Sequence, residues 1–118
     1  MKKLLLLAAS LTFSAGAWAD CEATNNKPSS LVACYEEQSY SAVLSHLNTL
    51  RKLSKEQLSY NPNIIKELDK SQSAWLAYRD SYCDTYSNYH TEAYNHSNCI
   101  INLNNQRAEQ LQQDIDAN

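Results

Sequence analysis

The sequence contains a single glycine, Gly16, among its 118 residues. Glycine is the residue that most readily supplies the left-handed backbone of tight hairpin turns and of loops that wrap phosphate groups. A chain without glycine after residue 16 therefore has neither a glycine-rich phosphate loop nor a glycine hairpin turn. This composition gives little support to a nucleotide-binding protein.

The first nineteen residues have the pattern of a secretory signal peptide. Two lysines precede an apolar run at positions 4–13, and residues 17–19, Ala-Trp-Ala, form the small-x-small pattern that signal peptidase cleaves. We expect residues 1–19 to be removed, so that the mature chain begins at Asp20. No other apolar run is long enough to span a bilayer, so we expect a bacterial periplasmic or secreted protein without an integral membrane anchor.

Residues 20–118 are expected to form one helical domain of 99 residues that contains all four cysteines. An even number of cysteines in a small exported chain predicts two disulfides. The formal net charge is −3 for the whole chain and −5 without the two lysines of the signal peptide. This acidity argues against nucleic acid and anionic membranes as partners and favours a basic protein partner.

The apolar spacing is helical throughout the expected mature chain. A first helix is expected from about residue 30 to the middle or high fifties, with Ser29 or Ser30 as its N-cap. Asn61 is expected to cap a second helix that has Pro62 in its first turn and continues to about His90. A polar turn at 90–97 precedes a third helix, in which apolar residues repeat at 3-4 spacing and Asn104 lies on the same stripe. The prediction is an all-α, three-helix up-down-up bundle with two disulfides.

This topology brings the cysteines to one end of the bundle. Pairing Cys83 with Cys99 would staple the second turn, and pairing Cys21 with Cys34 would fold the N-terminal arm onto the first helix. We slightly favour this pairing. The alternative, Cys34 with Cys83 and Cys21 with Cys99, is almost as compatible with the order of the helices.

The stretch 75–90, WLAYRDSYCDTYSNYH, concentrates aromatic rings on the second helix. The 3-4 alternation places Gln72, Trp75, Arg79 and Tyr82 on its inner face, and aromatic stripes of this kind usually belong to the core. The later part of the stretch is very polar and offers little packing surface. We therefore predict a possible partner-binding face formed by Asp84, Tyr86, Tyr89 and Tyr94.

We interpret the charged residues of this region first as groups that hold the helices together and second as contacts to a ligand. A buried Arg79 needs acceptors, which are expected to be helix-end carbonyls or an acid on another helix. Asp80 is not expected to be its partner, because adjacent residues diverge on a helix. Arg107 of the third helix is expected to reach Asp80 or Asp84.

The sequence offers little for catalysis or metal binding. Asp80 and Asp84 lie one turn apart, but any amphipathic helix contains such pairs. His90, Glu92 and His96 match no compact helical ligand spacing and lie in a polar turn. We predict no catalytic residue, no metal and no cofactor.

One set of residues has a recognisable spacing: Cys21, Cys34, Leu47, Asn48, Gln72, Trp75, Tyr78, Arg79, Asp80, Cys83, Cys99, Arg107 and Leu111. This pattern resembles that of the LprI-like lysozyme-inhibitor family of small exported bacterial domains, over essentially the whole mature chain. The resemblance implies that these residues mainly hold the fold together. Three positions depart from the family pattern: Leu44 replaces a frequent acidic residue, Arg51 a frequent aromatic one, and Asn104 the usual threonine.

The leading hypothesis is an exported binding protein that inhibits lysozyme-type peptidoglycan hydrolases by contact, and not an enzyme. Many such hydrolases are strongly basic, which suits an acidic partner. The alternative is a periplasmic adaptor, chaperone or immunity-type protein that binds another envelope protein. A small hydrolase or a metal-binding protein ranks third.

Overall fold

The computed structural model describes residues 21–117, so the expected signal peptide, residues 1–19, and Asp20 lie outside the described residues. Its long helices are α2 (Pro28–Gln57), α3 (Asn63–Tyr89) and α4 (Asn95–Asp116), and residues 21–24 form a further short helical segment. The all-α prediction is confirmed. The count of three helices is too low, because it omits the helical segment at residues 21–24.

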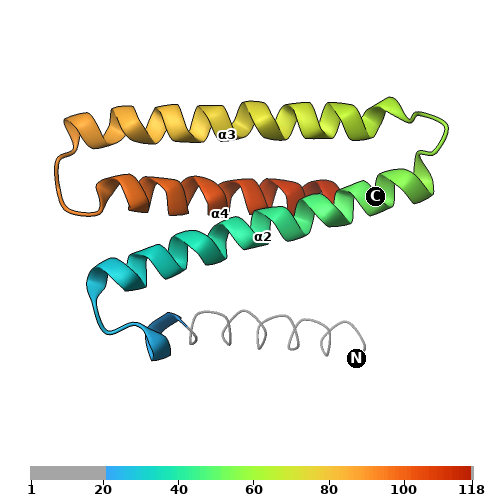
Figure 1. Cartoon of the computed structure of the whole chain (residues 1–118). Coiled ribbons are helices and arrows are strands. Elements are labelled where there is room, and N and C mark those ends of the chain that lie inside the picture. The colour runs from blue at the N-terminus through green and yellow to red at the C-terminus, as the bar shows by residue number, and fades with distance from the viewer. Residues whose placement is uncertain (1–20, 118) are drawn as a thin grey trace.

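The three long helices alternate in direction along the chain, and α4 lies between the other two (Figure 1). The contacts of α4 with α2 are the most extensive, those with α3 come next, and α2 and α3 touch each other least. The last helix of the sequence is therefore the one that joins the bundle together. None of the helices within residues 21–117 has the length and apolarity needed to cross a membrane.

The start of α2 differs from the prediction. The N-cap residue is Lys27, and Pro28 occupies the first helical turn without a side-chain cap. Proline suits this position because its ring holds φ at a helical value and its missing N–H has no partner there in any case. The expected cap Ser30 lies inside the helix, where its hydroxyl donates to the Lys27 carbonyl oxygen at 3.1 Å.

The other two helices also begin near, but not at, the predicted residues. Pro62 is the N-cap of α3 with φ −65°, so the helix starts one residue later than an Asn61 cap implies. Helix α4 begins at Asn95, inside the stretch predicted to be a turn. Its N-cap Tyr94 has a left-handed backbone with φ 64°, a conformation that glycine adopts without the clash of a Cβ atom. Because no glycine is present after residue 16, a tyrosine takes this strained role.

The apolar core consists of two clusters that lie along α4. The larger one contains Val43, Leu47 and Leu50 of α2 together with Leu111 of α4, and Trp75 is among the half-buried residues packed against it. The smaller cluster contains Cys83, Cys99 and Ile100, with Tyr86 and Leu103 packed against it. Four of the family-pattern residues, Leu47, Leu111, Cys83 and Cys99, thus belong to these core clusters.

The four cysteines form two disulfides, Cys21–Cys34 and Cys83–Cys99. This is the pairing that the sequence slightly favours. The first bond ties the helical segment at 21–24 to α2, and the second ties the end of α3 to the start of α4. A further link at the N-terminal end is the hydrogen bond that the Tyr35 hydroxyl donates to Glu22 Oε1 at 3.1 Å.

Replacement of Leu47 by alanine tests the larger cluster. Leu47 is 2% exposed, so Leu47→Ala should lower the free energy of unfolding by about 2–5 kcal/mol, through lost burial and the cavity left behind. The matched control is Leu44→Ala, one turn earlier on α2, where the side chain is 43% exposed; its cost should be about 0.5 kcal/mol or less. Urea unfolding followed by circular dichroism measures both, and equal losses would contradict the assignment of the core.

Candidate partner-binding surface

Four tyrosines form a continuous row along α3, which we call the tyrosine ladder: Tyr78, Tyr82, Tyr86 and Tyr89. Successive ring centroids are 5.7, 6.3 and 6.1 Å apart, within the usual range for interacting aromatic pairs. The His90 ring extends the row, 4.3 Å from Tyr86 and 4.9 Å from Tyr89. Each ring is therefore supported by a neighbour.

Most of the ladder is exposed. Tyr89 is 62%, Tyr78 52% and Tyr82 42% exposed, whereas Tyr86 is half-buried against the disulfide cluster. The expected exposure of Tyr89 agrees with this, but the expectations for Tyr82 and Tyr86 are wrong. The reason is Cys83, which must face α4 to bond Cys99; Tyr86 follows it one turn later on the same face, while Tyr82 is rotated by about 100°.

Asp84 of α3 and Tyr94 of the turn after α3 are also exposed. Asp84 Oδ1 accepts a hydrogen bond from His96 Nε2 at 2.9 Å, and the two residues link α3 to α4 beside the second disulfide. Tyr94 is 44% exposed and lies in the turn that follows the ladder. The proposed set of Asp84, Tyr89 and Tyr94 is therefore at the molecular surface, at the same end of α3.

The two histidines near the polar turn, His90 and His96, have contacts with other side chains. His96 bonds Asp84, and the His90 ring lies against two tyrosines of the ladder. Within residues 21–117 no group of three or more His, Cys, Asp or Glu side chains is arranged to hold a metal ion.

Arg79 is on the same helix as the ladder, and its side chain is largely buried. Its Nη1 donates to Asn104 Oδ1 on α4 at 3.0 Å, and its guanidinium carbon is 5.2 Å from the centre of the Tyr40 ring and 5.5 Å from that of Trp75. Arg79 Nε also donates to Asp80 Oδ1 at 2.9 Å. The expectation that Asp80 would not pair with Arg79 is therefore wrong: the two Cβ atoms diverge, but the long arginine side chain reaches back to the exposed flank where Asp80 lies.

Asn104 is fully buried and joins all three long helices. It accepts from Arg79 of α3, and its Nδ2 donates to Ser39 Oγ of α2 at 3.0 Å. The same amide nitrogen lies 3.5 Å from the Glu36 carbonyl oxygen. An amide has its acceptor and its donor on two separate atoms, so this one side chain bonds α3 through its oxygen and α2 through its nitrogen.

Arg107 of α4 also lies near the Trp75 ring. Its hydrogen bonds go to residues other than Asp80 and Asp84, which were the acids predicted for it. Its Nε donates to Gln72 Oε1 at 3.2 Å and its Nη1 to Gln110 Oε1 at 2.7 Å, while its guanidinium carbon is 5.8 Å from the Trp75 ring centre. Desolvation lowers the pKa of Arg107, and the nearby Asp114 carboxylate opposes that shift. The Trp75 ring thus contacts the guanidinium groups of both Arg79 and Arg107, which explains why a tryptophan and polar residues share one face of α3.

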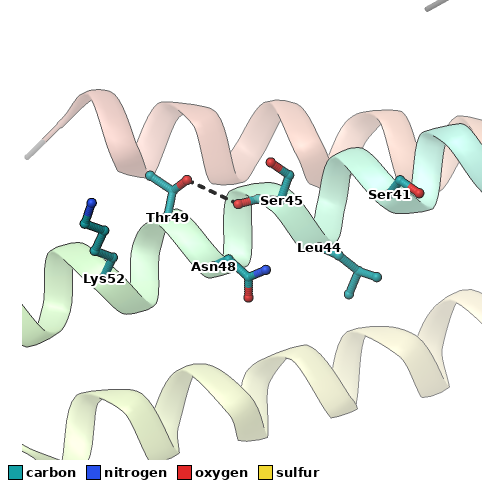
Figure 2. A pocket seen from close by; sticks show the side chains of 6 residues that line it. All are labelled: Ser41, Leu44, Ser45, Asn48, Thr49 and Lys52. Atoms are coloured by element: carbon teal, nitrogen blue, oxygen red, sulfur yellow. Dashed lines mark hydrogen bonds between the residues drawn. The ribbon is translucent and has the colours of Figure 1, made fainter.

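A shallow hollow that the sequence did not reveal lies on the outer side of α2 (Figure 2). It is lined by Ser41, Leu44, Ser45, Asn48, Thr49 and Lys52, with Thr49 Oγ1 donating to the Ser45 carbonyl oxygen at 3.2 Å. The sequence signal for this hollow is a series of small polar side chains around Leu44 that recur one helical turn apart: Ser41, Ser45, Asn48 and Thr49. Asn48 is exposed here and accepts from Arg51 Nη1 at 3.4 Å, so it does not share the core role of Leu47 beside it.

The comparisons with known proteins give one match. The sequence model of the family described as Lysozyme inhibitor LprI matches residues 19–111. This range contains all of α2 and α3 and most of α4. The comparisons with curated proteins and with solved structures found no match.

Replacement of Asn104 by alanine tests the buried polar link. Asn104→Ala would remove the acceptor of one Arg79 N–H and the donor to Ser39 Oγ, both in the interior, so the free energy of unfolding should fall by about 2–4 kcal/mol. The control is Asn105→Ala, an exposed neighbour on the same helix, which should change it by about 0.5 kcal/mol or less. Thermal and urea unfolding measure both variants. Wild-type stability in Asn104→Ala would show that the link contributes nothing.

Proposed function

The chain belongs to the family of lysozyme inhibitor LprI, and from this premise we propose that it binds a lysozyme-type muramidase and inhibits it through the tyrosine ladder. The observation that carries the proposal is the family match, which covers most of the chain. The ladder supplies the surface: it is a row of four neighbouring tyrosine rings on a single helix, and three of the four are exposed.

The physical properties of the ladder suit a protein contact. Tyrosine buries a large apolar area for few rotatable bonds, and its hydroxyl can still form a hydrogen bond, so tyrosines often dominate the binding free energy at interfaces. Ring-to-ring contacts along α3 restrict each side chain before the partner arrives. Restriction in the free protein reduces the entropy that is lost on binding.

Charge supports a basic partner. The residues outside the expected signal peptide carry a formal net charge of −5, and the exposed acids Asp80 and Asp84 of α3 belong to this excess, although they lie on a different face of the helix from the ladder. An acidic protein attracts a basic enzyme over a distance of about one Debye length and raises the association rate. The inhibitor itself then needs no catalytic group, because occupation of the cleft or its rim blocks access of the polysaccharide.

Both disulfides favour an oxidising compartment. Together with the expected signal peptide at residues 1–19, they support export to the periplasm or to the outside, where muramidases meet peptidoglycan. We include this location in the proposal.

Alanine variants of the ladder test the proposal. Tyr89→Ala and Tyr82→Ala should each weaken inhibition about tenfold or more, because a central interface tyrosine commonly contributes more than 1 kcal/mol. The matched control is Tyr60→Ala, since Tyr60 is 80% exposed and lies between α2 and α3, outside the ladder; it should leave inhibition unchanged. The readout is the rate at which lysozyme clears a peptidoglycan suspension in the presence of the oxidised protein. Melting temperatures should stay near that of the wild type.

Two outcomes would contradict the proposal. Unchanged clearing at a large molar excess of the wild-type protein would remove the inhibitory function. In that case, a single tight non-muramidase partner recovered from periplasmic extract would favour the adaptor, chaperone or immunity role. Full inhibition by both ladder variants would keep the function but reject this surface.

A further inference from the structure

A second surface feature is a groove between α3 and α4. One wall is formed by Trp75 and Tyr78 of α3, and the other by Leu103, Gln106, Arg107 and Gln110 of α4. Its lining combines two aromatic rings, one cation and two primary amides. In this groove Tyr78, the first tyrosine of the ladder, lies opposite the polar residues Gln106, Arg107 and Gln110 of α4.

Arg107 is the charged group of this groove. The bonds to Gln72 and Gln110 use two of the five N–H donors of its guanidinium group. Both acceptors are neutral amides that orient the guanidinium, while the Asp114 carboxylate nearby acts on its charge. A positive group held in this way, in a protein with an excess of acids, attracts an anion locally, and the planar fork matches a carboxylate.

The aromatic wall offers a different kind of contact. Trp75 is half-buried, and its indole is oriented by the guanidinium groups of Arg79 and Arg107, while Tyr78 is 52% exposed. Flat apolar rings of this kind pack against the C–H faces of pyranose sugars. The amides of Gln106 and Gln110 can donate to and accept from hydroxyl and acetamido groups.

We propose that the α3–α4 groove binds an acidic saccharide, with a sugar ring on Trp75 and Tyr78 and its carboxylate on Arg107. This is an activity of the chain itself and does not require contact with a muramidase. It would give the protein direct affinity for carboxylated cell-wall sugars, separate from any affinity for the enzyme that degrades them.

Tryptophan fluorescence tests the proposal directly. The chain has two tryptophans, Trp18 and Trp75, and Trp18 lies in the expected signal peptide. The emission of the exported protein therefore comes from the groove, and a Trp18→Phe background ensures this if the signal peptide is retained. The probes are the disaccharide of N-acetylglucosamine and N-acetylmuramic acid, the neutral disaccharide di-N-acetylchitobiose, and lactate as a carboxylate without a sugar ring.

A saturable change in Trp75 emission is expected with the acidic disaccharide, with at least tenfold weaker binding of the other two probes. Gln106→Glu should weaken the acidic disaccharide at least fivefold, because it places a like charge in the groove. The matched control is Gln57→Glu at the end of α2, away from the groove, which should bind as the wild type does. Gln106 is exposed, so neither variant should alter the melting temperature.

No saturable response to the acidic disaccharide would overturn the proposal, and so would equal affinity for the three probes or wild-type binding by Gln106→Glu. The titration contains no muramidase. Its failure would therefore leave the proposed inhibition untouched, and failure of the inhibition assay would leave the groove untouched.

Discussion

The relative placement of the three long helices depends on the side chain of Asn104. A buried amide is costly unless its donor and acceptor are both satisfied, and the partners of Asn104 come from two other helices: Arg79 of α3 and Ser39 of α2. Sliding or rotating either helix by one residue would separate these atoms. Apolar packing around Leu47 and Leu111 makes the bundle stable, but such contacts tolerate rearrangement, whereas the amide accepts one arrangement.

This constraint determines which face of α3 is left for a partner. Arg79 turned towards α4 and the Cys83–Cys99 disulfide one turn later fix the rotation of the helix about its axis. With these two residues inside, Tyr78, Tyr82 and Tyr89 have to point outwards, and the ladder becomes a surface held by the core behind it. A rigid aromatic face is what a protein needs if it acts by contact, since little order then has to be created on binding.

The sequence predicts the helices well, because apolar residues at 3-4 spacing can be satisfied only by helices packed against one another. It also places Asn104 on an inward-facing stripe, but its partners lie far away in the sequence and follow only from the assembled bundle. The exposure of Tyr82 and the partial burial of Tyr86 were missed for a related reason. A stripe of mixed aromatic and polar residues does not determine which face of α3 is turned towards the core. The Cys83–Cys99 disulfide fixes this rotation, because Cys83 has to face α4. The Arg79–Asp80 pair was missed because spacing rules describe Cβ directions and not the reach of a long side chain.

A muramidase bound as we propose covers the ladder while the bundle keeps its arrangement. Hydroxyl-radical footprinting of the protein, alone and with an excess of lysozyme, measures this for each tyrosine separately. Oxidation of Tyr82 and Tyr89 should fall strongly in the complex, while oxidation of Tyr60 should stay the same. Unchanged oxidation along the ladder, in a mixture where inhibition is complete, would contradict the proposed contact.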